Sequence, residues 1–350
     1  MGWSGTGSIG RSGIGSRAGW GACPGIPRGS GLAAIGRSTR NGAAILAPAG
    51  WHWREPASDR RRPPLHGPAI AAALRSCAPH RVEAPVARRK TLKLATFNVN
   101  GIGTRLPHLL AWLEKEAPDI VALQELKALD EAFPADALEA AGYGALWHGQ
   151  RSWNGVALLG RDTVPVESRR GLPGDAKDTQ SRYLEAAIHG IVVAAIYLPN
   201  GNPVPGPKYD YKLAWMRRLH RHAESLVDLP HPVAMIGDFN VIPHESDVYD
   251  PKAWRKDALF QPEVRERYEA LLAQGWTDAL LETFGEERPY TFWDYFRQHA
   301  ERDRGLRIDH LLLNPVLAKG LKEAGVDRWV RLQEKASDHA PTWVVVKAPG

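Results

Sequence analysis

Apolar and polar positions alternate in short runs throughout residues 91–350. Residues 91–97 follow the period of two that is typical of a half-buried strand. Residues 106–113 repeat leucine at helical spacing instead, which predicts a helix that ends before Pro118. By the same criteria we expect strands at 120–123, 143–147, 155–159, 184–188, 191–198, 233–236, 307–313 and 342–346, and helices at 134–141, 209–226 and 264–272.

These predicted strands outnumber the helices and do not follow a strict strand–helix–strand alternation. This order favours an α/β (α+β) fold in which two mixed β-sheets pack face to face and helices cover their outer sides. No repeat or linker divides residues 91–350, so we expect one domain there.

Residues 1–90 have a different composition. They hold 15 of the 34 glycines and 14 of the 45 Lys and Arg residues, but 3 of the 39 Asp and Glu residues. Such a segment buries too little apolar surface to offset chain entropy. We expect a disordered extension or sequence upstream of a true start near residue 90. A basic nucleic-acid-binding tail and an organelle-targeting peptide are the functional alternatives.

The remaining residues, 91–350, carry a net charge of −5. An anionic partner must therefore meet local basic patches or a bound metal, because the overall field does not attract it. Both cysteines, Cys23 and Cys77, precede residue 91, which leaves no thiolate chemistry for this part. No apolar run approaches the roughly 20 residues that a membrane span needs.

Polar groups that can bind metal or move protons gather where the predicted strands end. Asp238 and Asn240 follow the apolar run at 233–236, and in a strand two such positions point to the same side. Similar groups stand at four further places: Asn98, Glu125, Asp309 with His310, and Asp338 with His339.

Each of these residues also has a structural interpretation when it is taken singly. Asn98 could form a turn and Glu125 a helix cap. Asp309 could pair with Arg304 or Arg307. The recurrence of such groups at equivalent strand ends favours a shared site instead. An unpaired carboxylate is costly to bury on a strand, so its presence there indicates a function.

Several carboxylates without cysteine indicate a hard cation with oxygen ligands. Mg²⁺ fits best because it takes one or two carboxylates and keeps its waters, and we expect Mn²⁺ to substitute for it. Zn²⁺ would need more histidine or cysteine at ligand spacing. An acidic pocket of this kind suits hydrolysis of a phosphate ester.

Eight motifs then reveal a family resemblance. They are TFNVNG (96–101), LQELK (123–127), WNGVA (153–157), YLPNG (197–201), GDFN (237–240), TFWDY (291–295), RGLRIDH (304–310) and SDHAP (337–341). In this order they make residues 91–350 resemble the exonuclease III branch of the endonuclease/exonuclease/phosphatase superfamily, which includes the apurinic/apyrimidinic endonucleases. The resemblance implies a four-layered α/β sandwich.

The resemblance also implies a role for each residue. Glu125 would bind Mg²⁺ with Asn98 close by. Asp238 would take a proton from the attacking water, with His339 as the rival base. The implied catalytic set is Tyr197, Asp238, Asn240, Asp309 and His339. The implied metal-binding set is Asn98, Glu125, Asp238, Asn240, Asp338 and His339.

The resemblance further implies a Mg²⁺-dependent DNA repair nuclease: a 3′→5′ exonuclease on duplex DNA and an endonuclease 5′ to abasic sites. Phe292, Trp293 and Leu306 resemble an apolar pocket for a flipped-out sugar that lacks its base. The other implied substrate-binding residues are Asn200, Trp153, Asn154 and Arg182.

Basic side chains near the motifs could meet backbone phosphates; these are Lys127, Arg151, Arg182 and Arg304. We expect a cytoplasmic, nucleoid-associated monomer that does not bind membranes. The alternatives are a phosphodiesterase or phosphatase for a non-DNA phosphate ester, and a catalytically silent DNA-binding module.

Overall fold

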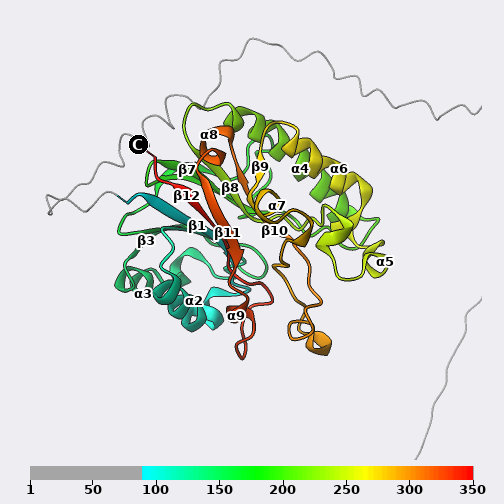
Figure 1. The fold of residues 1–350 in the computed structure, drawn as a ribbon, viewed down its shortest axis with the longest axis horizontal. Helices are drawn as coiled ribbons and strands as arrows, with labels where there is room; N and C mark the ends of the chain where they lie inside the picture. Colours follow the sequence, from blue (N-terminus) through cyan, green and yellow to red (C-terminus); the bar gives the residue numbers. More distant parts are fainter. Residues whose placement is uncertain (1–88, 350) are drawn as a thin grey trace, which may run out of the picture. The chain divides into compact units, whose positions relative to one another are not determined.

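The computed structural model describes residues 89–349. The interpretation of residues 1–90 as a disordered or mis-assigned extension therefore lies outside the described residues, apart from positions 89 and 90. The described strands form two six-stranded mixed sheets (Figure 1). Among the helices of the described residues, none has both the length and the apolar character to cross a membrane.

The first sheet has the order β11-β12-β1-β2-β4-β3 and the second the order β5-β6-β7-β8-β10-β9. The strands of the first sheet are β1 (Thr91–Asn98), β2 (Ile120–Gln124), β3 (Tyr143–His148), β4 (Val156–Arg161), β11 (Leu321–Val326) and β12 (Thr342–Lys347). Those of the second sheet are β5 (Val166–Arg170), β6 (Tyr183–Ile188), β7 (Ile191–Tyr197), β8 (Val233–Asp238), β9 (Thr277–Asp278) and β10 (Asp309–Leu313).

The two sheets pack on each other through one apolar layer. Leu94 and Val344 of the first sheet and Val193 and Ile236 of the second are fully buried in it. Period-two alternation sends the neighbouring side chains outward, where they meet the helices. The fold therefore needs helices on both outer faces to bury its remaining apolar surface.

Helices cover those outer faces as the sequence predicted. The helices are α2 (Ile102–Glu116), α3 (Ala135–Ala140), α4 (Pro207–Val227), α5 (Pro251–Trp254), α6 (Pro262–Leu272), α7 (Ala279–Phe284), α8 (Pro315–Ala318) and α9 (Arg328–Arg331). Apolar side chains of α2 and α3 pack on the first sheet, and those of α4 and α6 pack on the second. Figure 1 shows these two pairs of helices on opposite sides of the sheets. The four-layered sandwich is thereby confirmed.

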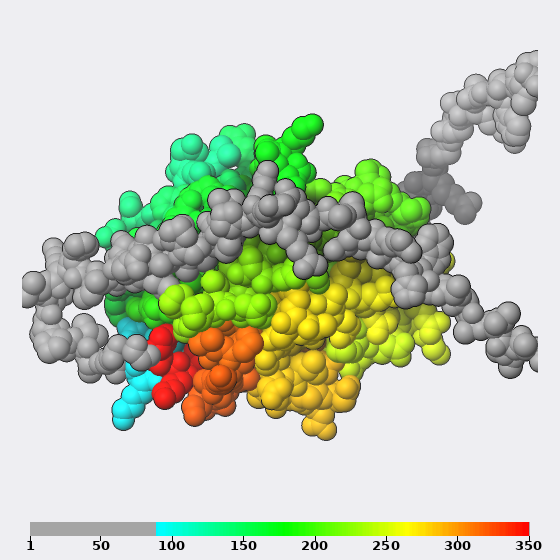
Figure 2. All heavy atoms as spheres, turned by 90° about the horizontal axis from the view of Figure 1, so that it is seen from above, coloured from blue at the N-terminus to red at the C-terminus, as the bar shows by residue number. Residues whose placement is uncertain are grey.

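The last described strand returns to the first. β12 pairs antiparallel with β1 from Thr91↔Lys347 to Thr96↔Thr342. In Figure 2 the C-terminal residues (red) accordingly lie beside the first described residues (cyan). This pairing brings the loop before β12, which holds His339, next to the end of β1.

The sequence prediction missed several short elements, namely strands β5, β9 and β11 and helices α5, α7, α8 and α9. β5 has three of its five residues charged, and β11 alternates weakly. The predicted strand at 307–313 was wrong at its start, because β10 begins at Asp309. Arg307 and Ile308 form a connection held by Asp247 and Thr291.

Candidate active site

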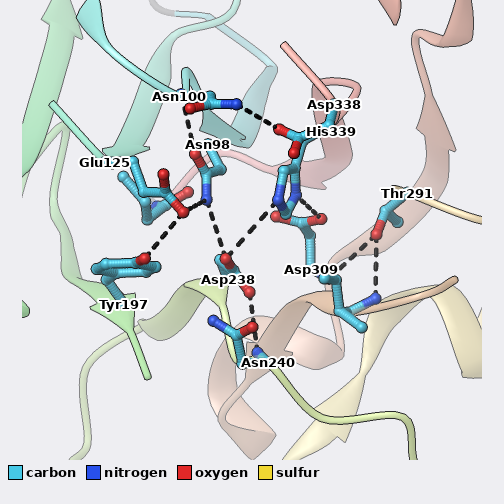
Figure 3. A network of polar contacts seen from close by, with 12 residues as sticks. Asn98, Asn100, Glu125, Tyr197, Asp238, Asn240, Thr291, Asp309, Asp338 and His339 are labelled. Atoms are coloured by element: carbon cyan, nitrogen blue, oxygen red, sulfur yellow. Dashed lines mark hydrogen bonds and ion pairs between the residues drawn. The ribbon is translucent and has the colours of Figure 1, made fainter. Parts of the chain in front are cut away.

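Five predicted residues meet at one end of the sandwich (Figure 3). Asn98 ends β1, and Glu125 follows β2, its parallel neighbour. Tyr197 and Asp238 are paired at the ends of the parallel strands β7 and β8. β10 runs antiparallel to β8, so its first residue, Asp309, lies opposite Asp238. Strand direction therefore collects these side chains from both sheets.

The local backbone explains two of the motif residues. A Cβ on Gly237 would lie 1.9 Å from the carbonyl oxygen of Ile196, so only glycine lets β8 approach β7 this closely just before Asp238. Glu125 has a left-handed φ of 52°. This conformation is unfavourable for a residue with a side chain and must be stabilised by the contacts around it.

Asn98 connects the carboxylates of the two sheets. Its Nδ2 donates to Glu125 Oε1 and to Asp238 Oδ2, both at 3.0 Å. Tyr197 donates its hydroxyl proton to the same Glu125 oxygen at 2.8 Å. One neutral amide thus holds two acidic groups close together without placing a further charge between them.

Glu125 is ionised in this environment. Burial alone would raise its pKa, but the ammonium of Lys127, 2.9 Å from Oε2, and the amide of Asn98 hold the pKa below its ordinary value. Tyr197 is neutral, because burial and the nearby Glu125 and Asp238 carboxylates raise its pKa well above 10. The site therefore offers an anionic ligand beside an uncharged hydroxyl donor.

His339 and Asp309 form a buried pair beside Asp238. His339 Nδ1 lies 2.8 Å from Asp309 Oδ2, and its Nε2 lies 3.8 Å from Asp238 Oδ2. Burial disfavours the imidazolium, yet the carboxylates of Asp309 and Asp238 raise the pKa of His339 to about 10. Burial, opposed by His339 and assisted by Asp309 and Glu125, raises the pKa of Asp238 to about 7.

Two asparagines next to Asp238 are fixed by backbone contacts. Asn240 donates its backbone N–H to Asp238 Oδ1 at 2.9 Å and its side-chain amide to Leu198 O at 2.9 Å. Asn200 Nδ2 donates to Asn240 Oδ1 at 3.1 Å. Both asparagines lie where the sequence placed them, in the loops after β7 and β8.

Lys212, on α4, is hydrogen-bonded to both of these loops. The sequence analysis missed it. Its fully buried ammonium donates to the carbonyl oxygens of Pro199, Asn200 and Asn240 at 3.1, 3.1 and 2.6 Å. The signal that could have found it is a lysine on the otherwise buried face of α4. A buried charge of this kind is retained only where its hydrogen bonds compensate its desolvation.

Asp338 lies on the side of the site nearer to the loop after β1. Its Oδ1 accepts a hydrogen bond from Asn100 Nδ2 at 3.0 Å (Figure 3). The hydroxyl of Ser337 donates to the carbonyl oxygen of Asn98 at 2.7 Å. The loop before β12 is thus tied directly to the end of β1.

Two predicted substrate-binding side chains are accessible around this centre, and a third is not. Trp153 is 70% exposed, with Lys127 Nζ 5.0 Å from the centre of its ring. The guanidinium of Arg182 lies over the ring of Tyr197 at 4.7 Å. Asn154 is buried and bonds to Gln150 at 2.7 Å, away from the carboxylates.

The three predicted pocket residues differ in position. The partly buried ring of Phe292 packs edge-on against His339, with 5.0 Å between ring centres. Trp293 and Leu306 are both 1% exposed, and Trp293 donates its Nε1–H to Asp303 at 3.0 Å. Phe292 alone of the three contacts the site histidine through its ring, and the substrate-binding role of all three stays a prediction.

His310 does not belong to the site, contrary to the expectation that it shares the position of Asp309. Adjacent residues of a strand point to opposite faces, so His310 faces the other side of the second sheet. There it contacts Arg307 at 2.8 Å and Val241 O at 3.0 Å. The partner of Asp309 is His339. The alternative ion pair of Asp309 with Arg304 or Arg307 is not formed, and Arg307 bonds to Asp278 instead.

The donor set fits a divalent cation held by few protein ligands. Glu125 supplies a carboxylate and Asp338 a further carboxylate nearby, whereas Asn98 turns its Nδ2 toward Glu125 and its amide oxygen already accepts the N–H of Asn100. Within residues 89–349, no three His, Cys, Asp or Glu side chains gather closely enough to enclose an ion. Mg²⁺ keeps several waters and needs only one or two carboxylates, whereas a closed Zn²⁺ site needs four donors.

Comparisons with known proteins agree with this geometry. The profile of the Endonuclease/Exonuclease/phosphatase family matches residues 95–339. The chain is 34% identical over 269 residues to exodeoxyribonuclease III of Haemophilus influenzae. This alignment covers 73% of the chain and 100% of that relative.

Two solved structures share the fold. An AP endonuclease from Archaeoglobus fulgidus superposes with a TM-score of 0.70 and 36% identity, over 74% of this chain and 100% of that one. A 3′ phosphatase from Neisseria, bound to a product DNA hairpin, gives the same score, identity and coverage.

Proposed function

The chain belongs to the endonuclease/exonuclease/phosphatase family, and we propose that it is a Mg²⁺-dependent DNA repair nuclease. It is a phosphodiester hydrolase of the AP endonuclease type. Its proposed reactions are cleavage 5′ to abasic sites and 3′→5′ removal of nucleotides from duplex DNA. One observation carries the proposal: Asn98 joins the carboxylates of Glu125 and Asp238 beside the Asp309–His339 pair.

The two unusual pKa values favour one assignment of the proton transfers. Asp238, with its pKa raised to about 7, is suited to accept the proton of the attacking water near neutral pH. His339, with a pKa of about 10, is protonated at that pH and therefore donates. The water oxygen attacks phosphorus and the P–O3′ bond breaks. O3′ leaves and takes a proton from solvent water to become the 3′-hydroxyl of the upstream strand, and the phosphate stays on the 5′ end of the downstream strand.

The remaining residues bind and orient the phosphate. Glu125 and Asn98 would hold Mg²⁺, which supplies charge neutralisation for the phosphate oxygens when it is bound. His339 would donate to a non-bridging oxygen as charge develops on it. Tyr197 and Asn200 would contact the scissile phosphate and keep it in line with the attacking water.

DNA is the substrate that the surroundings of the site favour. Arg182 and Lys127 can meet backbone phosphates, and Trp153 offers an exposed ring next to Lys127. Phe292, against His339, would line the space for a sugar without its base. A DNA repair role further suggests a cytoplasmic, nucleoid-associated protein, and we take it to act as a monomer.

The test uses the full chain and a labelled duplex that carries one abasic site. We expect a single cut 5′ to the lesion with Mg²⁺, no cut with EDTA, and recovery when Mn²⁺ replaces Mg²⁺. Asp238→Asn should lower the rate at least about 1,000-fold, because it removes the proton acceptor. Asp136→Asn, at an exposed position on α3, is the matched control and should cleave like the wild type.

Three outcomes would contradict the proposal or one of its parts. A folded protein that leaves both the abasic site and the 3′ end intact with either cation would point to a non-DNA phosphate ester. Full activity in EDTA would exclude the metal part of the proposal. Equal rates for Asp238→Asn and the control would remove Asp238 from the reaction.

A further inference from the structure

Thr291 lies beside Asp309 (Figure 3) and contacts the backbone near both members of the His339–Asp309 pair. Its side chain is fully buried. Oγ1 accepts hydrogen bonds from the backbone N–H groups of Ile308 and Asp309, both at 3.1 Å. Its carbonyl oxygen accepts the N–H of Ala340, the residue after His339, at 2.8 Å. A single residue therefore holds the chain segments of both members of the pair.

The hydroxyl uses its full capacity in this position. A threonine oxygen has two acceptor lone pairs, which two amides occupy, and one proton, which it donates to the carbonyl oxygen of Leu306 at 3.5 Å. These amides belong to consecutive residues at the point where β10 begins, so they lack the strand partners that later residues have. Without Oγ1, two buried N–H groups would be left without an acceptor, which proteins avoid.

The carboxylate of Asp309 depends on this backbone anchor. Its Oδ2 bonds to His339 Nδ1 at 2.8 Å. Its Oδ1 is buried and has no hydrogen-bond partner in the described structure. One hydrogen bond thus orients this carboxylate, and the position of the Asp309 backbone sets where the pair lies.

We propose that the Thr291 hydroxyl is a positioning group that fixes Asp309 and, through it, the orientation of His339 toward the phosphate. The inference deepens the proposed function and rests on it for its kinetic part. Thr291 touches neither substrate nor cation in this scheme. It acts through Asp309, and its removal affects the reacting geometry more than the binding of DNA.

Two substitutions separate the hydroxyl from the rest of the side chain. Thr291→Val keeps the shape and removes the acceptor, whereas Thr291→Ser keeps the acceptor and loses a methyl group. For Thr291→Val we expect kcat on the abasic duplex to fall roughly 10- to 100-fold with little change in KM, the scale of a small misplacement of a catalytic group. Thr291→Ser should restore most of kcat.

Two controls exclude a general effect on folding. Thr283→Val removes a threonine hydroxyl bonded at 2.8 Å to Ala279 O in α7, outside the site, and should not change kcat. In an Asp309→Ala background Thr291→Val should cost less than about 2-fold, since residues that act through one another are not additive. An equal loss with and without Asp309, or a loss in Thr291→Ser as large as in Thr291→Val, would overturn the proposal.

A spectroscopic readout does not depend on the reaction. The Nδ1 proton of His339, hydrogen-bonded to Asp309, should give a low-field proton NMR signal that is absent from His339→Gln. We expect Thr291→Val to shift or broaden this signal and Thr291→Ser to leave it in place. If the wild type cleaves no DNA but the signal responds in this way, the proposed function fails and the positioning role stands. An unchanged signal in Thr291→Val overturns the positioning role.

Discussion

Arg307 is the buried charge whose removal we expect to cost the most stability. It is fully buried on the side of the second sheet away from the site. Its Nε and one terminal nitrogen donate to Asp247 at 2.7 and 3.1 Å, and the other terminal nitrogen donates to Asp278 at 2.6 Å. Asp247 also accepts from Arg288 at 2.7 Å. Two cations and two anions thus share one network without solvent.

The size of the effect follows from what Arg307→Met leaves behind. Asp278 would keep a hydrogen bond from Tyr268 at 2.8 Å and two from the first backbone N–H groups of α7, but it would lose its ion pair with Arg307. Burial would then raise its pKa from far below the ordinary range. Breaking a buried pair in this way costs about 3–5 kcal/mol. Arg288 still neutralises Asp247, so we expect a value near the lower end, about 3 kcal/mol.

The assay is thermal and urea unfolding of the full chain, with Arg170→Met as the matched control. Arg170 forms a half-exposed ion pair with Glu167 at 2.6 Å. Such surface pairs contribute about 0–1 kcal/mol. At about 2–4 °C per kcal/mol for a domain of this size, Arg307→Met should lower Tm by roughly 6–12 °C and the control by roughly 0–4 °C.

The refuting result is a loss of stability in Arg307→Met no greater than in Arg170→Met. It would mean that the desolvation of the network cancels its attraction even when one cation is missing. Adding Asp247→Leu and Asp278→Leu to Arg307→Met refines the reasoning. Replacing all charges by apolar groups should recover part of the lost stability, because no unpaired carboxylate then remains buried.

Two further predictions concern the pH dependence and the site. Burial would raise the pKa of Glu185, but His222 and Tyr183 lower it to about 2. The ionised carboxylate therefore stabilises the folded protein above pH about 4.3, and this contribution is lost as pH falls toward 2. Glu185→Gln should therefore lower the free energy of unfolding by about 3 kcal/mol at pH 7 and by almost nothing near pH 2. Urea titrations that show the same difference between variant and wild type at both pH values would contradict this. Tyr197→Phe removes the 2.8 Å hydrogen bond to Glu125 and should lower kcat/KM about 10- to 100-fold at unchanged Tm. Tyr209→Phe, which loses a bond to Glu263 at 3.2 Å, is the control for cleavage of the abasic duplex, and equal activity of the two variants would refute the role of Tyr197.

Much of the fold could be predicted because the signals were local. The apolar runs at 184–188 and 191–198, on either side of the turn at 189–190, predicted β6 and β7, and the pattern in 209–226 predicted α4. The prediction failed where local pattern carried no information. β5 is an edge strand with charged residues, and only its pairing with β6 makes it a strand.

The errors at the site have a similar origin. Asp309 and His310 are adjacent in sequence and equally polar, so no local pattern distinguishes them. The start of β10 decides that Asp309 faces His339 while His310 faces Val241. Thr291 reads in sequence as one more β-branched residue. Its importance appears only when Asp309, 18 residues later, is brought to its hydroxyl.

The sequence by itself determined which chemical groups this protein carries, their order along the chain and the strands that they end. Strand periodicity and turn chemistry depend on neighbouring residues, so they can be read from the chain alone. The tertiary structure decided which groups meet. Asn98 reaches Asp238 across 140 residues, and Lys212 reaches Asn240 across 28. Burial then raises the pKa of Asp238, and that desolvation exists only once both sheets have closed over the site.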